Sequence, residues 1–162
     1  MAYSGLDPRK DIREYIGTAR DLLGDGKDKY CITVSYRGNH FIPIYTTEES
    51  KSDIIPPLPF IEFGLLDSKA EPHDIRASTR KNEAIIDVNI YWTAQDNIDS
   101  SDFGKAISDK LYDLIRSNQC TILGTNSFIN VNRTGKVFIE NYGKQVVYHK
   151  NMEIYVLYYD KP

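Results

Sequence analysis

The stretch EAIIDVNIYWT, residues 83–93, decides the fold class because its side chains alternate in polarity. Every second side chain from Ala84 to Trp92 is apolar and would point to one face of a β-strand. The side chains between them include Asp87 and Asn89, so the opposite face is mixed in polarity. A strand with one apolar and one mixed face is typical of an antiparallel sheet that is covered on one side only.

Two amphipathic helices are predicted to provide this cover. Residues 103–115, FGKAISDKLYDLI, carry apolar side chains at helical spacing. A first helix of about four turns is expected between Asp7, which can cap it, and Gly24, which can end it. The fold class is therefore predicted as α+β, a mostly antiparallel sheet with two amphipathic helices packed on one face.

Further strands are expected on both sides of residues 83–93. Residues 30–36 alternate, and residues 40–45 can return beside them as an edge strand, because Pro43 has no backbone donor. The predicted elements do not alternate between strand and helix, as they would in a parallel sheet. The other predicted strands are 60–66, 121–123, 128–132, 136–141, 145–148 and 152–159, with TGK (134–136) and NYGK (141–144) as turns.

Residues 67–82 have no apolar period and are predicted to form a long loop. A loop of about sixteen residues in a compact domain is commonly functional or disordered. Its basic residues Arg76, Arg80 and Lys81 can be solvated and balanced by nearby carboxylates, or they can contact an acidic partner or DNA. The loop carries no aromatic residue that could stack on bases, which weakens the nucleic-acid interpretation.

The bulk composition limits the class of protein. The chain has 162 residues, which suits a single domain spanning 1–162. The net charge of −3 argues against a protein whose main task is to hold a nucleic-acid backbone. No segment has the character of a signal peptide or the roughly 18 apolar residues of a membrane span, so a cytoplasmic address is expected.

The sequence carries no motif for catalysis or cofactor binding. It has no GxSxG, P-loop or GxGxxG pattern in a suitable context. His40, His73 and His149 are isolated in sequence and are interpreted as ordinary surface or loop residues. Cys31 and Cys120 lie far apart and are interpreted as reduced core cysteines. We therefore expect no enzyme, no cofactor and no metal site.

The order of the predicted elements is similar to that of a known family. A helix near the N-terminus precedes a proline-marked strand, a long strand, an amphipathic helix and a terminal strand. The segments that carry this order are PPLPFIEFG (56–64), EAIIDVNIYW (83–92), FGKAISDKLYDLI (103–115) and MEIYVLYY (152–159). Over roughly residues 8–160 the chain resembles the tail-terminator and tail-completion proteins of long-tailed phages, including lambda-like minor tail proteins and related head–tail joining proteins.

The resemblance implies a structural role in virion assembly. Such proteins form a hexameric ring that caps the tail tube, stops its polymerisation and provides the surface that joins the head. The implied partners are further copies of the chain, the tail tube protein and a head-completion or connector protein, with DNA at most passing through the ring. The implied location is the virion tail, and the host cytoplasm during assembly. The residues expected at the assembly interface are Glu62, Arg76, Arg80, Lys81 and Tyr91.

Two other functions stay open at this point. A binding or adaptor module of the same α+β class would be a stable monomer or dimer with a concave apolar pocket. A small enzyme would need a pocket that joins His73 or His149 to a carboxylate.

Overall fold

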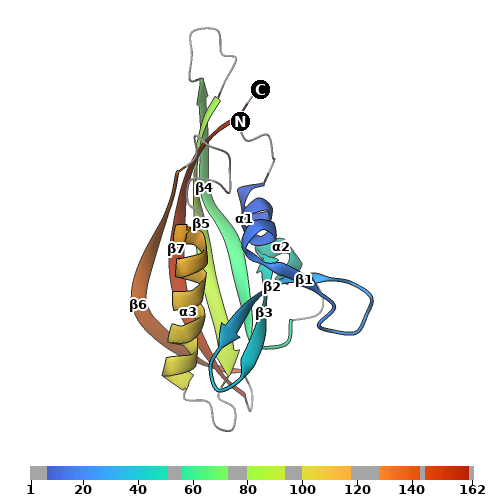
Figure 1. Cartoon of the computed structure of the whole chain (residues 1–162). Coiled ribbons are helices and arrows are strands. Elements are labelled where there is room, and N and C mark those ends of the chain that lie inside the picture. Colours follow the sequence, from blue (N-terminus) through green and yellow to red (C-terminus); the bar gives the residue numbers. More distant parts are fainter. Residues whose placement is uncertain are drawn as a thin grey trace.

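The computed structural model describes residues 7–50, 56–72, 80–93, 100–117, 128–142 and 145–160. These ranges contain three helices and seven strands (Figure 1). The helices are α1 (Pro8–Ile16), α2 (Thr47–Ser50) and α3 (Ser100–Ser117). The strands are β1 (Thr18–Arg20), β2 (Lys29–Ser35), β3 (Asn39–Thr46), β4 (Phe60–Pro72), β5 (Arg80–Thr93), β6 (Phe128–Tyr142) and β7 (Gln145–Asp160).

The described strands form one sheet in the order β1-β2-β3-β4-β5-β7-β6. All neighbours are antiparallel except β3 and β4, which run parallel with Ile44 opposite Ile61. The predicted α+β class with a mostly antiparallel sheet is confirmed, whereas the parallel pair was not predicted. A parallel connection needs about a dozen residues or more, and the chain between β3 and β4 supplies them. The helix described there, α2, has only four residues and gave no strong sequence signal for the crossover.

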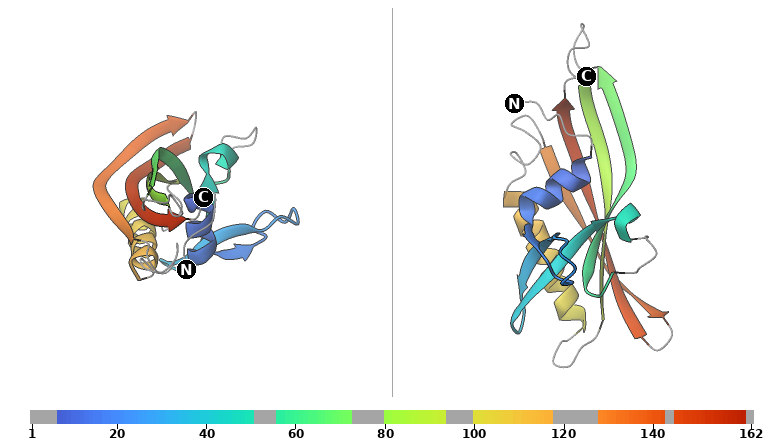
Figure 2. Two further views of the ribbon diagram at one scale, coloured as in Figure 1. Left: turned by 90° about the horizontal axis from the view of Figure 1, so that it is seen from above. Right: turned by 90° about the vertical axis from the view of Figure 1, so that its right-hand side faces the viewer.

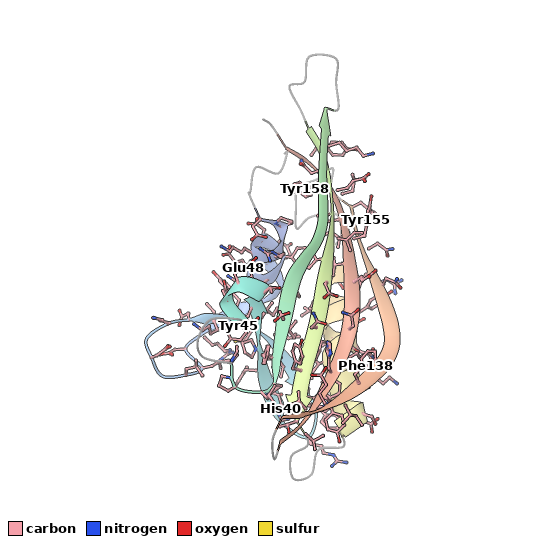
Figure 3. The ribbon with its side chains drawn as sticks, turned by 180° about the vertical axis from the view of Figure 1, so that it is seen from behind. His40, Tyr45, Glu48, Phe138, Tyr155 and Tyr158 are labelled. Atoms are coloured by element: carbon pink, nitrogen blue, oxygen red, sulfur yellow. The ribbon has the colours of Figure 1, made fainter. Side chains whose placement is uncertain are left out.

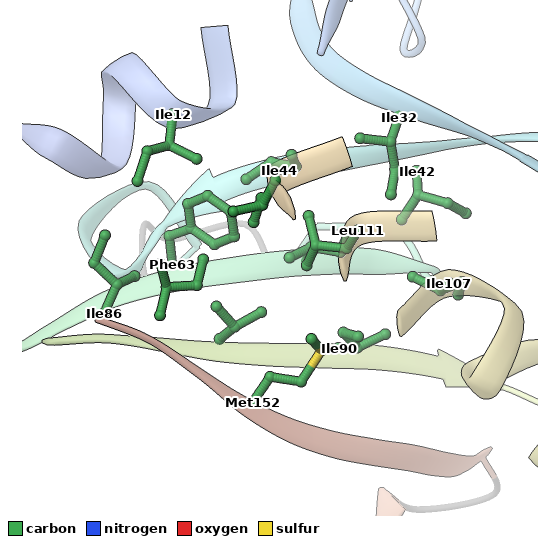
Figure 4. Packing of buried hydrophobic residues seen from close by; sticks show 14 of the residues in the cluster. Ile12, Ile32, Ile42, Ile44, Phe63, Ile86, Ile90, Ile107, Leu111 and Met152 are labelled. Atoms are coloured by element: carbon green, nitrogen blue, oxygen red, sulfur yellow. The ribbon is translucent and has the colours of Figure 1, made fainter. Parts of the chain in front are cut away.

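Helices α1 and α3 cover the same face of the sheet, as predicted. Ile12 of α1 and Leu111 of α3 are fully buried and belong to one cluster with Phe63 of β4 and Ile90 of β5 (Figure 4). Seen along the strands, the sheet curves around α3 (Figure 2). The alternation of residues 83–93 thus has its expected cause, since the apolar set from Ala84 to Trp92 lies under the helices.

Helix α3 approaches the sheet closely at Gly104. A Cβ atom at this position would lie 2.2 Å from two ring atoms of Trp92, a side chain that is fully buried. Only a glycine lets the helix backbone and the indole ring come this close. Gly104 therefore sets the distance between α3 and β5.

The first helix is shorter than predicted. Asp7 does cap it, with Oδ1 accepting from the Arg9 backbone N–H at 3.0 Å. The helix ends at Ile16, however, and the Gly17 N–H donates to the Arg13 carbonyl at 2.8 Å. Residues 18–20 then pair with β2, because strand pairing satisfies backbone groups that a continued helix would have satisfied internally.

The prediction of a loop at residues 67–82 is wrong for most of that range. Strand β4 continues to Pro72 and β5 begins at Arg80, with these two residues opposite each other. Residues 73–79 lie outside the described residues. The β4–β5 hairpin extends past α1 and α3 in Figures 1 and 2. None of the described helices covers this part, so its strands are held by backbone pairing and need no apolar alternation.

The remaining strands are longer than the predicted pieces. TGK lies inside β6, where the pairing register shifts between Arg133 and Val137, so it is an irregularity and not a turn. The predicted reversal near NYGK is confirmed, since Tyr142 of β6 pairs with Gln145 of β7. Strand β3 is internal, although its pairing with β4 begins only after Pro43. The expected strand 121–123 lies outside the described residues.

Candidate functional site

The face of the sheet turned away from α1 and α3, here called the outer face, carries a row of rings. Each ring comes from a different one of five neighbouring strands, and successive centroids are 5.9, 5.0, 4.6 and 6.0 Å apart. Figure 3 shows Tyr45 and Phe138 toward the two sides of this face. This aromatic row consists of Tyr45, Phe60, Tyr91, His149 and Phe138.

The strand register creates the aromatic row. Tyr91 of β5 lies opposite Phe60 of β4 on one side and opposite His149 of β7 on the other. Phe138 of β6 in turn lies opposite His149. Directly opposed side chains on one face of a sheet are close enough to pack ring against ring. The aromatic row therefore stiffens the sheet across β3 to β6.

A polar network lies beside the aromatic row. The Asn89 Nδ2 donates to Asp87 Oδ2 at 2.9 Å, and Asn89 Oδ1 accepts from Asn151 Nδ2 at 3.0 Å. His149 Nε2 lies 2.6 Å from the same Asn89 Oδ1. Since an amide oxygen only accepts, the Nε2 atom of His149 carries a proton and donates it. His149 Nδ1 then faces Glu140 Oε1 at 3.9 Å.

This environment favours the neutral form of His149. Burial lowers the pKa of the imidazole below its ordinary value, and the nearby carboxylates of Glu140, Asp87 and Glu62 oppose this effect without reversing it. His149 was interpreted from sequence as an ordinary surface or loop residue, and that interpretation is wrong, because it is part of a strand and of two contact networks. Its alternation with Val147 and Asn151 could have placed it on a sheet face.

A second polar cluster attaches α1 to the sheet. Arg9 is buried and its guanidinium contacts Asp7 at 3.0 Å and Glu48 at 3.0 Å. Arg13 contacts Glu49 of α2 at 2.6 Å. Burial alone would raise the pKa of Glu49, but the hydrogen bond and charge of Arg13 hold it below its ordinary value. The Glu48 and Glu49 pairs join α1 to α2, and Arg9 and Arg13 also donate to the Phe63 and Ile44 carbonyls of the sheet.

Two of the predicted assembly residues lie close together on the outer face. Tyr91 is part of the aromatic row, and Glu62 of β4 pairs in register with Asn89 of β5. The carboxylate of Glu62 accepts a short hydrogen bond from the Ser50 hydroxyl. Both side chains are therefore engaged within the fold.

The basic residues of the predicted set are far from that pair. Lys81 lies ten residues from Tyr91 along β5, which corresponds to about 33 Å of extended strand. Its Nζ is 3.3 Å from Glu83. Arg80 is the first residue of β5, and Arg76 lies outside the described residues. The predicted set is thus divided between two regions of the molecule.

Exposed apolar side chains gather at the two ends of the sheet, and sequence reasoning missed both groups. On the β6–β7 hairpin, Ile139 is 65% exposed and Phe138 is 49% exposed. Three successive apolar residues in a strand put apolar side chains on both faces, which was a readable signal. We name this group, Val137, Phe138, Ile139 and Val146, the β6–β7 patch.

The opposite end of the sheet has its own apolar group. Leu22 and Leu23 follow β1 and are exposed, although the predicted first helix ran to Gly24 and would have included them. Together with Phe41 of β3 they form what we name the β1–β3 patch. Beside it lies a hollow of about 310 Å³. Its lining includes all three patch residues together with Pro43, Tyr45, Pro57, Leu58 and Pro59.

Other candidate sites in the described ranges are structural. No three His, Cys, Asp or Glu side chains there come together as metal ligands. His40 Nε2 lies 2.8 Å from the Tyr36 carbonyl, and the ring packs edge-on against Phe103. Cys31 is a buried core residue, as predicted, and burial raises the pKa of its thiol to about 11. Cys120 and His73 lie outside the described residues.

No helix in these ranges has both the length and the apolar character needed to cross a membrane. Comparison with protein-family models finds none that matches the chain, and comparison with curated proteins finds no significant match.

Proposed function

We propose that this chain is a structural protein of a long-tailed phage particle or provirus, with the role of a tail terminator. Copies of the chain form a ring that caps the tail tube, stops its polymerisation and offers a surface for joining the head. The partners are further copies of the chain, the tail tube protein and a head-completion or connector protein. The place of action is the virion tail, reached after assembly in the host cytoplasm.

The order of elements supports this proposal. The resemblance rests on a helix, a proline-marked strand, a long strand, an amphipathic helix and a terminal strand. These elements correspond to helix α1, strands β4 and β5, helix α3 and strand β7.

The observation that carries the proposal is the position of the exposed apolar side chains. Contiguous exposed apolar groups on a protein surface mark sites of contact with other macromolecules. Here exposed apolar side chains lie at the two ends of one open sheet, on both faces of β6 in the β6–β7 patch and at Leu22, Leu23 and Phe41 in the β1–β3 patch. Two separate contact surfaces on one chain are what a subunit inside a larger assembly requires.

The environment of His149 argues against a catalytic role for the outer face. A general acid or base must reach a substrate proton through a free ring nitrogen. Nε2 of His149 is engaged by Asn89, Nδ1 faces the Glu140 carboxylate at 3.9 Å, and the ring is stacked on Tyr91 at 4.6 Å. The hollow beside the β1–β3 patch has other lining residues. We therefore assign His149 a structural role in the sheet.

The test is the assembly state of the purified chain, alone and with tail tubes. Light scattering should give the mass of a ring, and negative-stain microscopy should show rings in isolation or at tube ends. Added chain should also limit the growth of tubes from their subunit. A chain that is monomeric at every concentration and never binds a tube end would overturn the proposal.

The hollow favours a second candidate, a non-catalytic binding or adaptor module. Its volume of about 310 Å³ lies at the lower end of the range for small-molecule pockets, and its lining is rich in leucine, proline and aromatic residues. This function predicts a stable monomer or dimer whose hollow binds an apolar probe. Competition of such a probe with ring formation would show that the hollow serves assembly instead.

A further inference from the structure

Strand β6 divides into an anchored half and an exposed half. In the first half, residues 128–133, Ile129 is buried in the core and Val131 packs against the core. In the second half, residues 137–142, Ile139 is 65% exposed. Among the described strands β6 is the last of the sheet, so it has a neighbouring strand on one side only (Figure 1). The second half is therefore held mainly by its pairing with β7.

A change of register separates the two halves of β6. Arg133 lies opposite Met152 and Val137 lies opposite Lys150, so three residues of β6 stand against one residue of β7, Asn151. Extra residues of this kind bend a strand and interrupt its ladder of hydrogen bonds. The second half can therefore open while the first half stays paired, with the register shift as the hinge.

His149 of β7 lies next to the second half of β6. Phe138 is directly opposite His149, with 6.0 Å between ring centroids, and Tyr91 stacks on the other side of the imidazole at 4.6 Å. Glu140 Oε1 lies 3.9 Å from Nδ1, and the His149 side chain is 18% exposed. The next residue of β7, Lys150, points to the opposite face of the sheet. Because Phe138 and Glu140 belong to the second half of β6, opening of that half exposes the imidazole to water.

A charged imidazole is better accommodated in the opened form. Nε2 of His149 already donates a proton to Asn89 Oδ1 at 2.6 Å, so a second proton must go to Nδ1. Carboxylates face the ring from three strands, namely Glu62 of β4, Asp87 of β5 and Glu140 of β6. They favour the imidazolium, but burial outweighs them and keeps the pKa of the ring below its ordinary value. Opening restores water around the ring, so the opened form binds the proton more tightly.

We propose that the second half of β6 is an acid-sensitive flap: a proton taken up at Nδ1 of His149 releases residues 137–142 from β7 while residues 128–133 stay paired. Release uncovers His149 and moves Phe138 and Ile139, the most exposed side chains of the β6–β7 patch, away from their places on the sheet. Such a flap goes beyond the proposed function and does not require that the chain form a ring.

Amide hydrogen exchange followed by mass spectrometry of short peptides tests the proposal, with rates expressed as protection factors that remove the intrinsic pH dependence of exchange. Residues 137–142 should be less protected than residues 128–131, and low urea should leave their protection unchanged, because a local opening exposes little surface. From about pH 7.5 to about pH 5.5 their protection should fall severalfold. The limit is about tenfold, because histidine in the opened form titrates with its ordinary pKa of about 6.5.

Three variants identify the group that takes up the proton. His149→Gln cannot be charged and keeps an amide N–H for Asn89, so the fall in protection should disappear. Glu140→Gln removes a carboxylate that favours the imidazolium, so the fall should become larger. His40→Gln is the matched control, because His40 lies on β3 and packs against Phe103, and it should leave the fall unchanged. Circular dichroism and thermal melting establish folding, and His149→Asn replaces His149→Gln if the latter does not fold.

Each of the other outcomes overturns the proposal. Protection of residues 137–142 that is constant with pH, or that rises in acid, shows that the proton does not release them. A fall that persists in His149→Gln, or that vanishes in Glu140→Gln, assigns the acid response to another group. Equal protection and equal urea dependence in residues 128–131 and 137–142 show that β6 opens as a whole. These results leave the ring function untouched, since light scattering tests it separately.

Discussion

Replacing Gly104 with alanine sets two opposing effects against each other. Inside a helix, alanine is favoured over glycine by about 1 kcal/mol, so Gly104→Ala should stabilise α3 if only the helix mattered. In the folded structure the added Cβ would lie 2.2 Å from the Trp92 ring. That distance is far inside van der Waals contact, so the helix or the indole must move.

The size of the effect follows from the packing. Overpacking of a well-packed core costs about 1 to 3 kcal/mol and occasionally more. Trp92 is fully buried and forms part of the main cluster, so the cost should fall at the upper end of that range. After the helical gain, we expect a net loss of about 2 kcal/mol in the free energy of unfolding. For a chain of this length the melting temperature should fall by about 4 to 8 °C.

Urea denaturation followed by tryptophan fluorescence measures this loss, because Trp92 is the single tryptophan of the chain. Lys105→Ala is the control for helix propensity, since Lys105 is an exposed neighbour in α3. In a Trp92→Phe background, followed by circular dichroism, the cost of Gly104→Ala should shrink because the larger ring is gone. A Gly104→Ala variant that is more stable than the unaltered chain would refute the described packing of α3 on β5.

Three further predictions concern His149, Cys31 and the pair Arg76 and Arg80. As the pH falls below about 6.5, the unfolded chain takes up a proton at His149 before the folded chain does. This residue should therefore lower the free energy of unfolding as the pH falls from about 6.5 to the depressed pKa of His149 in the folded state. Urea titrations at several pH values should therefore show a weaker acid dependence for His149→Gln, and parallel curves would contradict the burial of the ring. In a Cys120→Ser background, Cys31 should react slowly with a thiol reagent at pH 8 until the protein unfolds, because its thiol is buried with a pKa of about 11. Rapid labelling of the folded protein would show that β2 opens. Arg76→Glu combined with Arg80→Glu should impair head joining and make it less dependent on salt concentration, without lowering the melting temperature. Normal joining by this variant would exclude the region as an assembly contact.

Elements with strong local signals could be predicted from the sequence. Residues 83–93 form part of β5 with the expected face buried, and α3 covers the predicted helix 103–115. Both segments bury a complete apolar stripe, so their periodicity reflects their environment directly. The Asp7 cap was readable for the same reason, because a cap acts within one turn of chain.

Elements whose form depends on distant partners were not predictable in this way. The end of α1 at Ile16 depends on the pairing of residues 18–20 with β2. The continuation of β4 to Pro72 depends on the opposite strand β5, since no apolar period marks it. Of the candidate site residues, Glu62 and Tyr91 lie on the outer face, but their engagement by Ser50 and His149 comes from other strands or helices.

The sequence by itself determined that this chain has one strand with a buried face, two amphipathic helices to cover it and no motif of known chemistry. These properties are local, because each follows from the spacing of side chains along one segment. Tertiary structure alone decided that His149 joins a row of rings and that Leu23 and Ile139 stay exposed at opposite ends of the sheet. Strand order and register set both results, and they arise from hydrogen bonds between segments that are far apart in the chain.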